Sequence, residues 1–260
     1  MPSSSAALAP ATPGLGAIHV PKSSGVLAGR LQQQILSGSF PPGSALPTER
    51  ELVSTTGLGR SSVREALRIL EAQGLVRTRA GRYGGSVASK PDDALLAGHI
   101  SLFAKGHSVP LRALVEARQA LEPMVAYLAA CNRTNTDLGE LKRIAARLDA
   151  AAIDDVPQFL LENAHWHNAL AAASHNDLLR AFTSSISGLM LEASRMDYFA
   201  SPAVRGLVTH AHRRILLAIE AGDGDLARQR AGRDLLAYAK HLAAAVRAER
   251  RKAQRKREPA

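Results

Sequence analysis

The apolar residues in the first part of the chain recur at the spacing of short helices. Residues 26–36 carry an apolar stripe of helical period, and the segment 40–47, which contains glycine and proline, ends that helix. Thr48 and Glu51 have the spacing of a capping box, in which each side chain bonds the backbone N–H of the other residue. A second, short helix is therefore predicted after Thr48, ending near Gly57.

A third helix is predicted from residue 60 to about 73. Val63 and Leu70 mark its apolar face, and Gly74 suits the left-handed conformation that closes many helices. The segment 75–89 alternates in part between apolar and polar residues and has glycines in its middle, which is typical of a two-stranded hairpin. Three helices followed by a hairpin predict a winged helix-turn-helix.

Arginines form a second stripe on the third helix. Arg60, Arg64 and Arg68 follow one another at intervals of four residues, so they share a face that is separate from the apolar one. The major groove of B-DNA accepts an α-helix, arginine is a good donor to guanine, and Ser61 and Ser62 can bond phosphates or base edges. An ordinary solvated basic face is the alternative, and the order of the elements favours DNA binding.

The predicted hairpin adds basic residues to this surface. Arg77, Arg79 and Arg82 can reach the backbone or the minor groove of a bound duplex. Gly81 lies in the hairpin among them and allows its backbone to approach the DNA closely. The third helix and the hairpin together predict a surface for double-stranded DNA.

The chain beyond residue 92 reads as nearly all helix, rich in alanine and leucine. The sequence "SKPDD" at residues 89–93 interrupts the pattern and marks the boundary between two domains. The helices expected after it cover residues 93–105, 110–131, 136–152, 156–173, 177–199, 202–221 and a last one from 223 into the tail. The predicted fold is mainly α: a winged helix-turn-helix followed by an all-α bundle of six or seven helices.

The net charge of +10 is concentrated at the two ends of the chain. Residues 1–90 hold ten basic against four acidic residues, a net +6, and residues 247–260 hold seven against two, a net +5. Residues 91–246 are close to neutral, with sixteen against seventeen. Basic ends indicate a polyanionic partner, although solubility alone tolerates them. The basic tail at 247–260 either adds phosphate contacts or is a solvated, frayed helix end, and we favour the second.

No apolar run approaches the roughly 20 residues that span a bilayer, so no membrane partner is expected. Residues 1–21 resemble neither a signal peptide nor a folded segment and are predicted to be a disordered leader. Cys131 is the single cysteine, which excludes an intramolecular disulfide framework and fits a reducing compartment. A cytoplasmic protein is expected.

The run "LPTERELVSTTGLGRSSVREALRILEAQGLV" at residues 46–76 closely resembles the motif of the GntR family of bacterial transcription regulators. This resemblance implies that the third helix is the recognition helix and that the protein binds a palindromic operator as a homodimer. The family's DNA-contacting positions, with adjoining positions in the recognition helix and wing, correspond here to Arg50, Arg60, Ser61, Ser62, Arg64, Gly81 and Arg82.

Three further segments resemble the effector-binding domain of the FadR-type subfamily, known as the FCD domain. They are "EARQALEPMVAYLAA", "ENAHWHNALAAASHNDLL" and "HRRILLAIEAGDGDLARQRA". The resemblance implies a ligand-responsive regulator, with a repressor expected, whose effector is a small organic acid. The expected organisation is a leader at 1–21, the winged helix-turn-helix at 22–90, the effector-binding and dimerisation domain at 91–246, and the basic tail at 247–260.

Many members of this subfamily are similar in holding a divalent metal at the centre of the bundle. Asn163, His167 and His212 match three of the ligand positions, whereas Asp234 stands where a third histidine is expected. Aspartate is a competent ligand for Zn, Mn or Ni, so a mixed site is one interpretation. The other is that the metal is lost and the four residues are polar groups inside a bundle. The sequence does not decide between them.

Arg118 is the first choice as the anchor for the effector's carboxylate. The alternative is that it pairs with Glu122 four residues later along the helix, and this is nearly as strong. A second function class, a metal-dependent hydrolase in the helical domain, is motivated by the histidines. It is disfavoured because the chain has no HExxH motif and no glycine-rich nucleophile turn, and we predict no enzyme activity.

Overall fold

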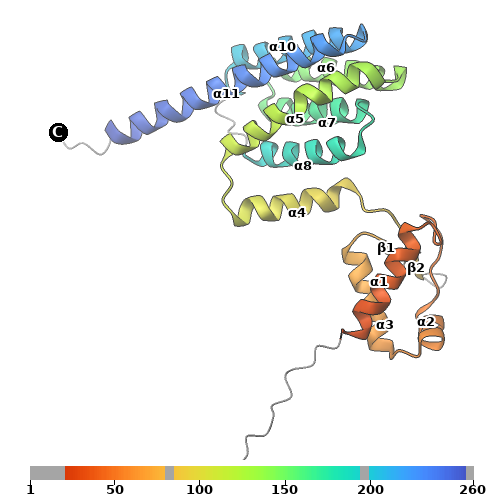
Figure 1. Cartoon of the computed structure of the whole chain (residues 1–260). Coiled ribbons are helices and arrows are strands. Elements are labelled where there is room, and N and C mark those ends of the chain that lie inside the picture. Colours follow the sequence, from red (N-terminus) through yellow and green to blue (C-terminus); the bar gives the residue numbers. More distant parts are fainter. Residues whose placement is uncertain (1–20, 80–84, 194–198, 256–260) are drawn as a thin grey trace, which may run out of the picture. The chain divides into compact units, whose positions relative to one another are not determined.

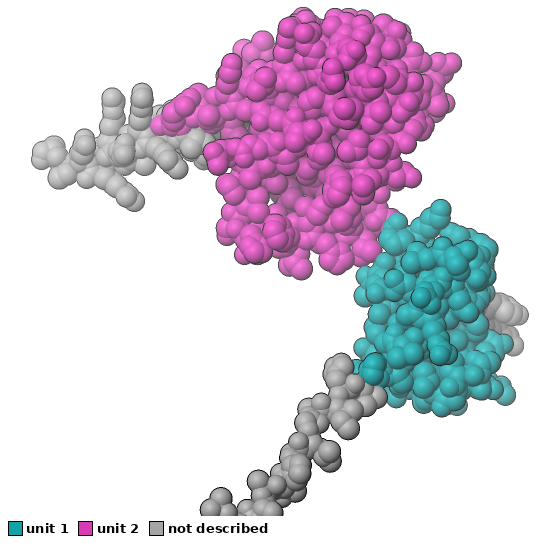
Figure 2. All heavy atoms as spheres, viewed as in Figure 1, with its two compact units in different colours: residues 1–91 teal, residues 92–260 magenta. Residues whose placement is uncertain are grey.

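The computed structural model describes residues 21–79, 85–193 and 199–255, and the chain divides into two compact units, 1–91 and 92–260 (Figure 2). The described residues form helices and a two-stranded antiparallel sheet, which confirms the predicted fold class. The expected leader lies outside the described residues except for its last position, 21. Gly81 and Arg82 also lie outside the described residues.

The first unit contains three helices and a hairpin (Figure 1). These are α1 (Ser23–Leu36), α2 (Glu49–Thr56), α3 (Arg60–Ala72), β1 (Val76–Arg79) and β2 (Gly85–Ala88). The capping box that begins α2 is present: the backbone N–H of Thr48 donates to Glu51 Oε2 at 2.7 Å, and that of Glu51 donates to Thr48 Oγ1 at 3.3 Å. Gly57 follows α2 and Gly74 follows the last turn of α3. Both adopt the left-handed conformation, with φ 70°. These caps confirm the predicted helix boundaries.

The core of the first unit forms because α3 places its apolar stripe against α1 and the hairpin. Val63 and Leu70 are fully buried, and Leu27 of α1 and Val76 of β1 belong to the same cluster. Each of these side chains contributes roughly 1.5 to 3 kcal/mol when it is removed from water. Burial of this stripe fixes the rotation of α3 about its axis, and it therefore decides which residues of α3 face the solvent.

The second unit contains seven described helices (Figure 1). They are α4 (Asp93–Gly106), α5 (Leu111–Asn132), α6 (Asn135–Ala151), α7 (Val156–Ala173), α8 (Asp177–Ala193), α10 (Pro202–Glu220) and α11 (Gly224–Arg255). A continuous core joins α5, α6, α7, α10 and α11 around Trp166, which is fully buried. Helix α11 continues into the expected basic tail and extends beyond the other helices. The helix expected at 177–199 is described only to Ala193, because residues 194–198 are outside the described set.

Arg205 of α10 fastens two chain segments of this unit to each other. Its guanidinium is buried and donates to the carbonyl oxygens of Ala152 at 2.8 Å and Ile153 at 2.9 Å, which follow the end of α6. It also donates to the carbonyl oxygens of Phe199 at 2.6 Å and Ala200 at 2.9 Å. Four carbonyl dipoles therefore solvate this buried charge in place of a carboxylate. Among the described helices, none is long and apolar enough to cross a membrane.

Candidate functional site

The outer face of α3 carries the predicted arginine stripe. Arg60, Arg64 and Arg68 are all exposed, at intervals of one helical turn, on a face separate from that of the buried residues of α3. Arg50 of α2 is exposed as well. Within the described residues, neither Arg50 nor Arg60 has an ion-pair partner. These two exposed guanidinium groups, one on α2 and one at the start of α3, are suited to contact phosphates and base edges.

Arg64 is held by an acidic residue of the neighbouring helix. Its Nε donates to Glu49 Oε2 at 2.9 Å, and both side chains are largely exposed to solvent. The hydrogen bond to Glu49 raises the pKa of Arg64, which stays charged in either case. Because solvent screens such an exposed pair, it contributes little to stability. The contact instead limits the rotamers of Arg64 in the absence of DNA, and the sequence spacing between α2 and α3 gave no sign of it.

The two serines at the start of α3 differ in their surroundings. Ser61 is exposed, whereas Ser62 is half-buried and its Oγ accepts a hydrogen bond from Ser23 Oγ of α1 at 3.2 Å. Ser62 therefore joins α3 to α1. A groove of about 490 Å³ lies beside Arg64 and Arg68, with the hairpin as its other wall. This surface is concave and has both acidic and basic residues on its rim.

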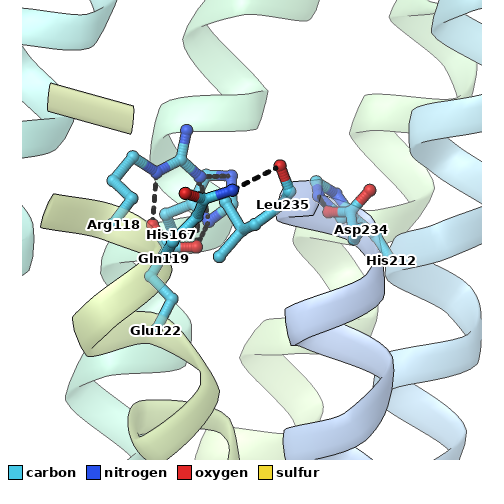
Figure 3. A network of polar contacts seen from close by, with 7 residues as sticks. All are labelled: Arg118, Gln119, Glu122, His167, His212, Asp234 and Leu235. Atoms are coloured by element: carbon cyan, nitrogen blue, oxygen red, sulfur yellow. Dashed lines mark hydrogen bonds and ion pairs between the residues drawn. The ribbon is translucent and has the colours of Figure 1, made fainter. Parts of the chain in front are cut away.

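A second group of polar residues lies buried in the helical unit (Figure 3). Arg118 and Glu122 of α5 form an ion pair one helical turn apart, with Arg118 Nη2 3.1 Å from Glu122 Oε2 and Nε bonded to the other oxygen. Arg118 Nη2 also lies 2.6 Å from Nε2 of His167 on α7, while Nδ1 of His167 lies 3.1 Å from Glu122 Oε2. The ion pair with Glu122, which was the alternative role for Arg118, is thus present, and His167 contacts both members of the pair.

The electrostatics of this triad follow from its burial. Burial alone would raise the pKa of Glu122, and the charge of Arg118 and the contact with His167 reverse this, so its pKa is lowered and it is ionised. Burial and the nearby Arg118 lower the pKa of His167, which leaves its imidazole neutral. A neutral His167 that donates from Nδ1 to Glu122 accepts at Nε2 from Arg118. The three groups therefore satisfy one another.

His212 and Asp234 form the other half of the buried group. The ring of His212 stacks on Trp166, with centroids 4.8 Å apart, and its Nε2 lies 3.7 Å from Asp234 Oδ2. Burial lowers the pKa of His212 well below its usual value and raises the pKa of Asp234 to about 7. Neither His212 Nδ1 nor Asn163 Oδ1 has a hydrogen-bond partner among the described residues. Such buried polar atoms normally bind water or a ligand.

The expected metal ligands line one cavity, but they do not form a metal site as they lie. Asn163, His167, His212 and Asp234 all border a cavity of about 40 Å³. The Nε2 lone pair of His167 is engaged by Arg118, whose positive charge opposes a second cation beside it. No cluster of three or more histidine, cysteine or acidic side chains within the described residues could hold a metal ion. The donor set therefore does not fit a divalent metal in this arrangement.

Two residues that sequence reasoning missed complete this site. Tyr238 of α11 lines the cavity beside Arg118, and burial raises the pKa of its phenol, which remains protonated. Trp166 stacks on the ring of His212 and thereby restrains its orientation. Tyr238 lies one turn after Asp234 on α11, so the i, i+4 spacing from a candidate ligand was the available signal.

Comparison with known proteins agrees with these two units. Residues 24–83 match the gntR family of bacterial regulatory proteins, and residues 113–237 match the FCD domain. The chain is 31% identical to the HTH-type transcriptional regulator LutR of Bacillus subtilis over 196 residues, covering 73% of this chain and 87% of that protein. It is 28% identical to the galactonate operon transcriptional repressor of Escherichia coli, covering 77% and 88% respectively.

Two further proteins are similar over most of their length. The Glc operon transcriptional activator of Escherichia coli is 31% identical, and the match covers 80% of this chain and 84% of that protein. A solved structure of a GntR protein from Streptococcus agalactiae superposes with a TM-score of 0.64 at 25% identity, covering 84% of this chain and 99% of that one. All these relatives are regulators, so the hydrolase interpretation has no support. This chain belongs to the GntR family and is a bacterial transcriptional regulator with an FCD domain.

Proposed function

We propose that this regulator is a repressor that binds a palindromic operator as a homodimer in the cytoplasm. The exposed arginine stripe of α3 is the observation that carries the proposal. One recognition helix reads only a few base pairs, and two copies related by two-fold symmetry supply the missing affinity on a palindrome. The proposed DNA-contacting residues are Arg50, Arg60, Ser61, Ser62, Arg64, Gly81 and Arg82.

DNA binding can be tested with an operator selected from random duplexes by the purified protein. Fluorescence anisotropy should give a much lower Kd for the selected duplex than for its scrambled form. Arg64→Ala should weaken operator binding roughly 5- to 150-fold if Arg64 makes a bidentate base contact. Arg30→Ala, an exposed arginine of α1 outside the stripe, is the matched control and should retain affinity. Equal affinity of wild type for the operator and the scrambled duplex would contradict the proposal.

For the second unit we propose a small organic acid as the effector, with Arg118 as its anchor. Its hydrogen bonds use Nε and Nη2, as the dashed lines in Figure 3 show, so Nη1 remains as a donor for a carboxylate. The partnerless Asn163 Oδ1 and His212 Nδ1 border the same cavity and can orient a hydroxyl or a water beside that carboxylate. An entering anion would compete with Glu122 for the guanidinium, and the cavity must widen to admit it.

We propose that the effector weakens operator binding by changing how two winged helices are spaced. A ligand shifts such an equilibrium only if it binds the two arrangements with different affinity. Coupling of ~1 to 3 kcal/mol changes DNA affinity roughly 5- to 150-fold. Linkage is reciprocal, so saturating operator must change effector affinity by the same factor. Calorimetric titrations with and without operator that give identical dissociation constants would reject this gating.

A divalent metal held by Asn163, His167, His212 and Asp234 remains a prediction from the family resemblance. It requires Arg118 to leave His167, since the guanidinium engages the imidazole in this arrangement. Metal analysis of protein purified without an affinity tag decides between the two interpretations. About one equivalent of Zn, Mn or Ni per chain, lost in His212→Ala, would establish the mixed site. Metal-free protein that responds to its effector would establish that the four residues act without metal.

A further inference from the structure

Helices α10 and α11 enclose a second, larger cavity on the outer side of Asp234 and Tyr238. It has a volume of about 290 Å³, close to the lower end of the roughly 300 to 1,000 Å³ typical of small-molecule sites. We call it the groove, and we call the cavity of about 40 Å³ beside Arg118 the central cavity. Asp234 and Tyr238 border both of them. The groove has a basic side formed by Arg214, Arg230 and Arg233 and an apolar side formed by Val204, Leu207 and Ala237.

The three arginines of the groove have no carboxylate partner among the described residues, unlike their neighbours. Arg213 of α10 pairs with Asp149 of α6 at 2.7 Å, and Arg228 of α11 pairs with Asp225 of the same helix at 2.8 Å. Arg230 donates from Nη1 to the backbone carbonyl of Arg214, and its Nε is buried without a partner. A concave surface with three such guanidinium groups attracts anions.

The single acid that lines the groove does little to offset this charge. Even when ionised, Asp234 supplies one negative charge against the three positive charges of Arg214, Arg230 and Arg233. The other titratable groups that line the groove are His210, His241 and Tyr238, none of which carries a negative charge at neutral pH. The groove therefore keeps a net positive charge.

The apolar side of the groove favours a ligand that has a hydrocarbon part. Leu207 lines this concave surface, and it is 61% exposed. Burying an apolar side chain of this size contributes roughly 1.5 to 3 kcal/mol. A ligand with a hydrocarbon body would cover Leu207 and leave its anionic end among the arginines. The central cavity, at about 40 Å³, holds little more than a water or two as it stands.

We infer that the groove between α10 and α11 is a binding site for an amphipathic organic anion, a carboxylate on a short hydrocarbon body. It is separate from the Arg118 cavity and does not depend on the role proposed for that cavity. Charge complementarity with the three arginines selects the carboxylate, and Val204, Leu207 and Ala237 select the hydrocarbon. Asp234 and Tyr238 form the partition between the two sites, so occupation of the groove acts directly on the wall of the central cavity.

The experiment uses the full chain and hexanoate as the probe, followed by isothermal titration calorimetry at constant ionic strength. Acetate, which has the same charge without the hydrocarbon body, is the ligand control. Arg233→Gln removes one exposed guanidinium from the groove, and Arg230→Gln removes the more buried one. Arg228→Gln is the matched control on the same helix, because Arg228 pairs with Asp225 and does not line the groove. Arg118→Gln reports on the central cavity.

Hexanoate should bind wild type and the R228Q variant alike, more tightly than acetate, and at least tenfold more weakly to R233Q and R230Q. Thermal unfolding of each variant identifies any loss that comes from misfolding, and the exposed position 233 keeps the test valid if R230Q unfolds. Wild type that does not bind hexanoate, or that binds it as R233Q does, overturns the inference. Loss in R118Q alone places hexanoate in the central cavity and also overturns it, while supporting the function proposed for Arg118. A groove substitution that dissociates the oligomer without changing hexanoate affinity assigns the groove to a second copy of the chain, which overturns it too.

Discussion

Replacing Arg118 by methionine should destabilise the helical unit strongly, because it leaves a buried carboxylate without its countercharge. Glu122 is only 4% exposed, and its ionised state depends on Arg118. The remaining contact, with His167, comes from an imidazole that burial keeps neutral. Breaking a buried ion pair in this way costs about 3 to 5 kcal/mol. At roughly 2 to 4 °C per kcal/mol for a unit of this size, the unfolding midpoint should fall by roughly 6 to 20 °C.

The pH dependence of this loss has a definite sign. In the wild type, the lowered pKa of Glu122 contributes stability that is present above its unfolded value of 4.5 and is lost as the pH falls toward the folded value. In Arg118→Met, burial acts without the guanidinium and raises the folded pKa above 4.5. The carboxylate is then most costly at neutral pH and is relieved by protonation. The difference between variant and wild type should therefore be largest near neutral pH and should shrink as the pH falls toward 4.5.

The fluorescence of Trp166 provides the assay, since it is the single tryptophan and lies fully buried in the helical core. Urea unfolding followed at this residue reports on the second unit alone. Arg112→Met is the matched control: Arg112 and Glu116 have the same spacing on the same helix, but both are exposed. Its loss should stay below about 0.5 kcal/mol. Equal losses for the two methionine variants, or a loss for Arg118→Met that is independent of pH, would refute the reasoning.

Three further results are expected. Asp234→Asn should be more stable than wild type at neutral pH. The pKa of Asp234 rises from 3.8 to about 7 on folding, so the wild type loses stability as the pH increases between those values. Urea midpoints of variant and wild type that differ by a constant amount across this pH range would contradict it. Gly224→Ala should lower the free energy of unfolding by about 1 to 3 kcal/mol, since the added Cβ would lie 2.8 Å from Tyr127 Cδ2. Gly139→Ala in α6 is the control: its Cβ would meet open space, and it should raise the free energy of unfolding by roughly 0.5 to 1 kcal/mol, both measured by thermal unfolding. Glu49→Gln should strengthen binding to scrambled DNA, because it removes a negative charge beside Arg64, and an unchanged Kd would argue against that pairing.

The winged helix-turn-helix could be predicted closely because its determinants are local. Capping by Thr48 and Glu51 and the left-handed Gly74 depend on residues within one turn of one another, and the stripe of Val63 and Leu70 needs only the helical period. The same holds for the pairing of Arg118 and Glu122, whose spacing along one helix offered it as an alternative.

The contacts between helices could not be derived in this way. That Arg118 reaches His167, 49 residues away, depends on how α5 packs against α7, and sequence periodicity does not specify it. The same is true of Glu49 beside Arg64 and of the groove arginines, which read as ordinary surface residues until α10 and α11 lie side by side. Helical period determines which face of a helix is buried, but it does not determine which residue of another helix that face meets.

Arg205 has a consequence for how the bundle is closed. Arg205 bonds the carbonyl oxygens that follow α6, and it therefore joins positions 53 residues apart. These bonds close a loop of chain that contains α7 and α8. A disulfide would restrict that loop in a similar way, but its strength would depend on the redox state of its surroundings. A guanidinium bonded to carbonyl groups contains no bond that a reductant can break. The bundle is thereby given a cross-link that is reversible and indifferent to redox potential.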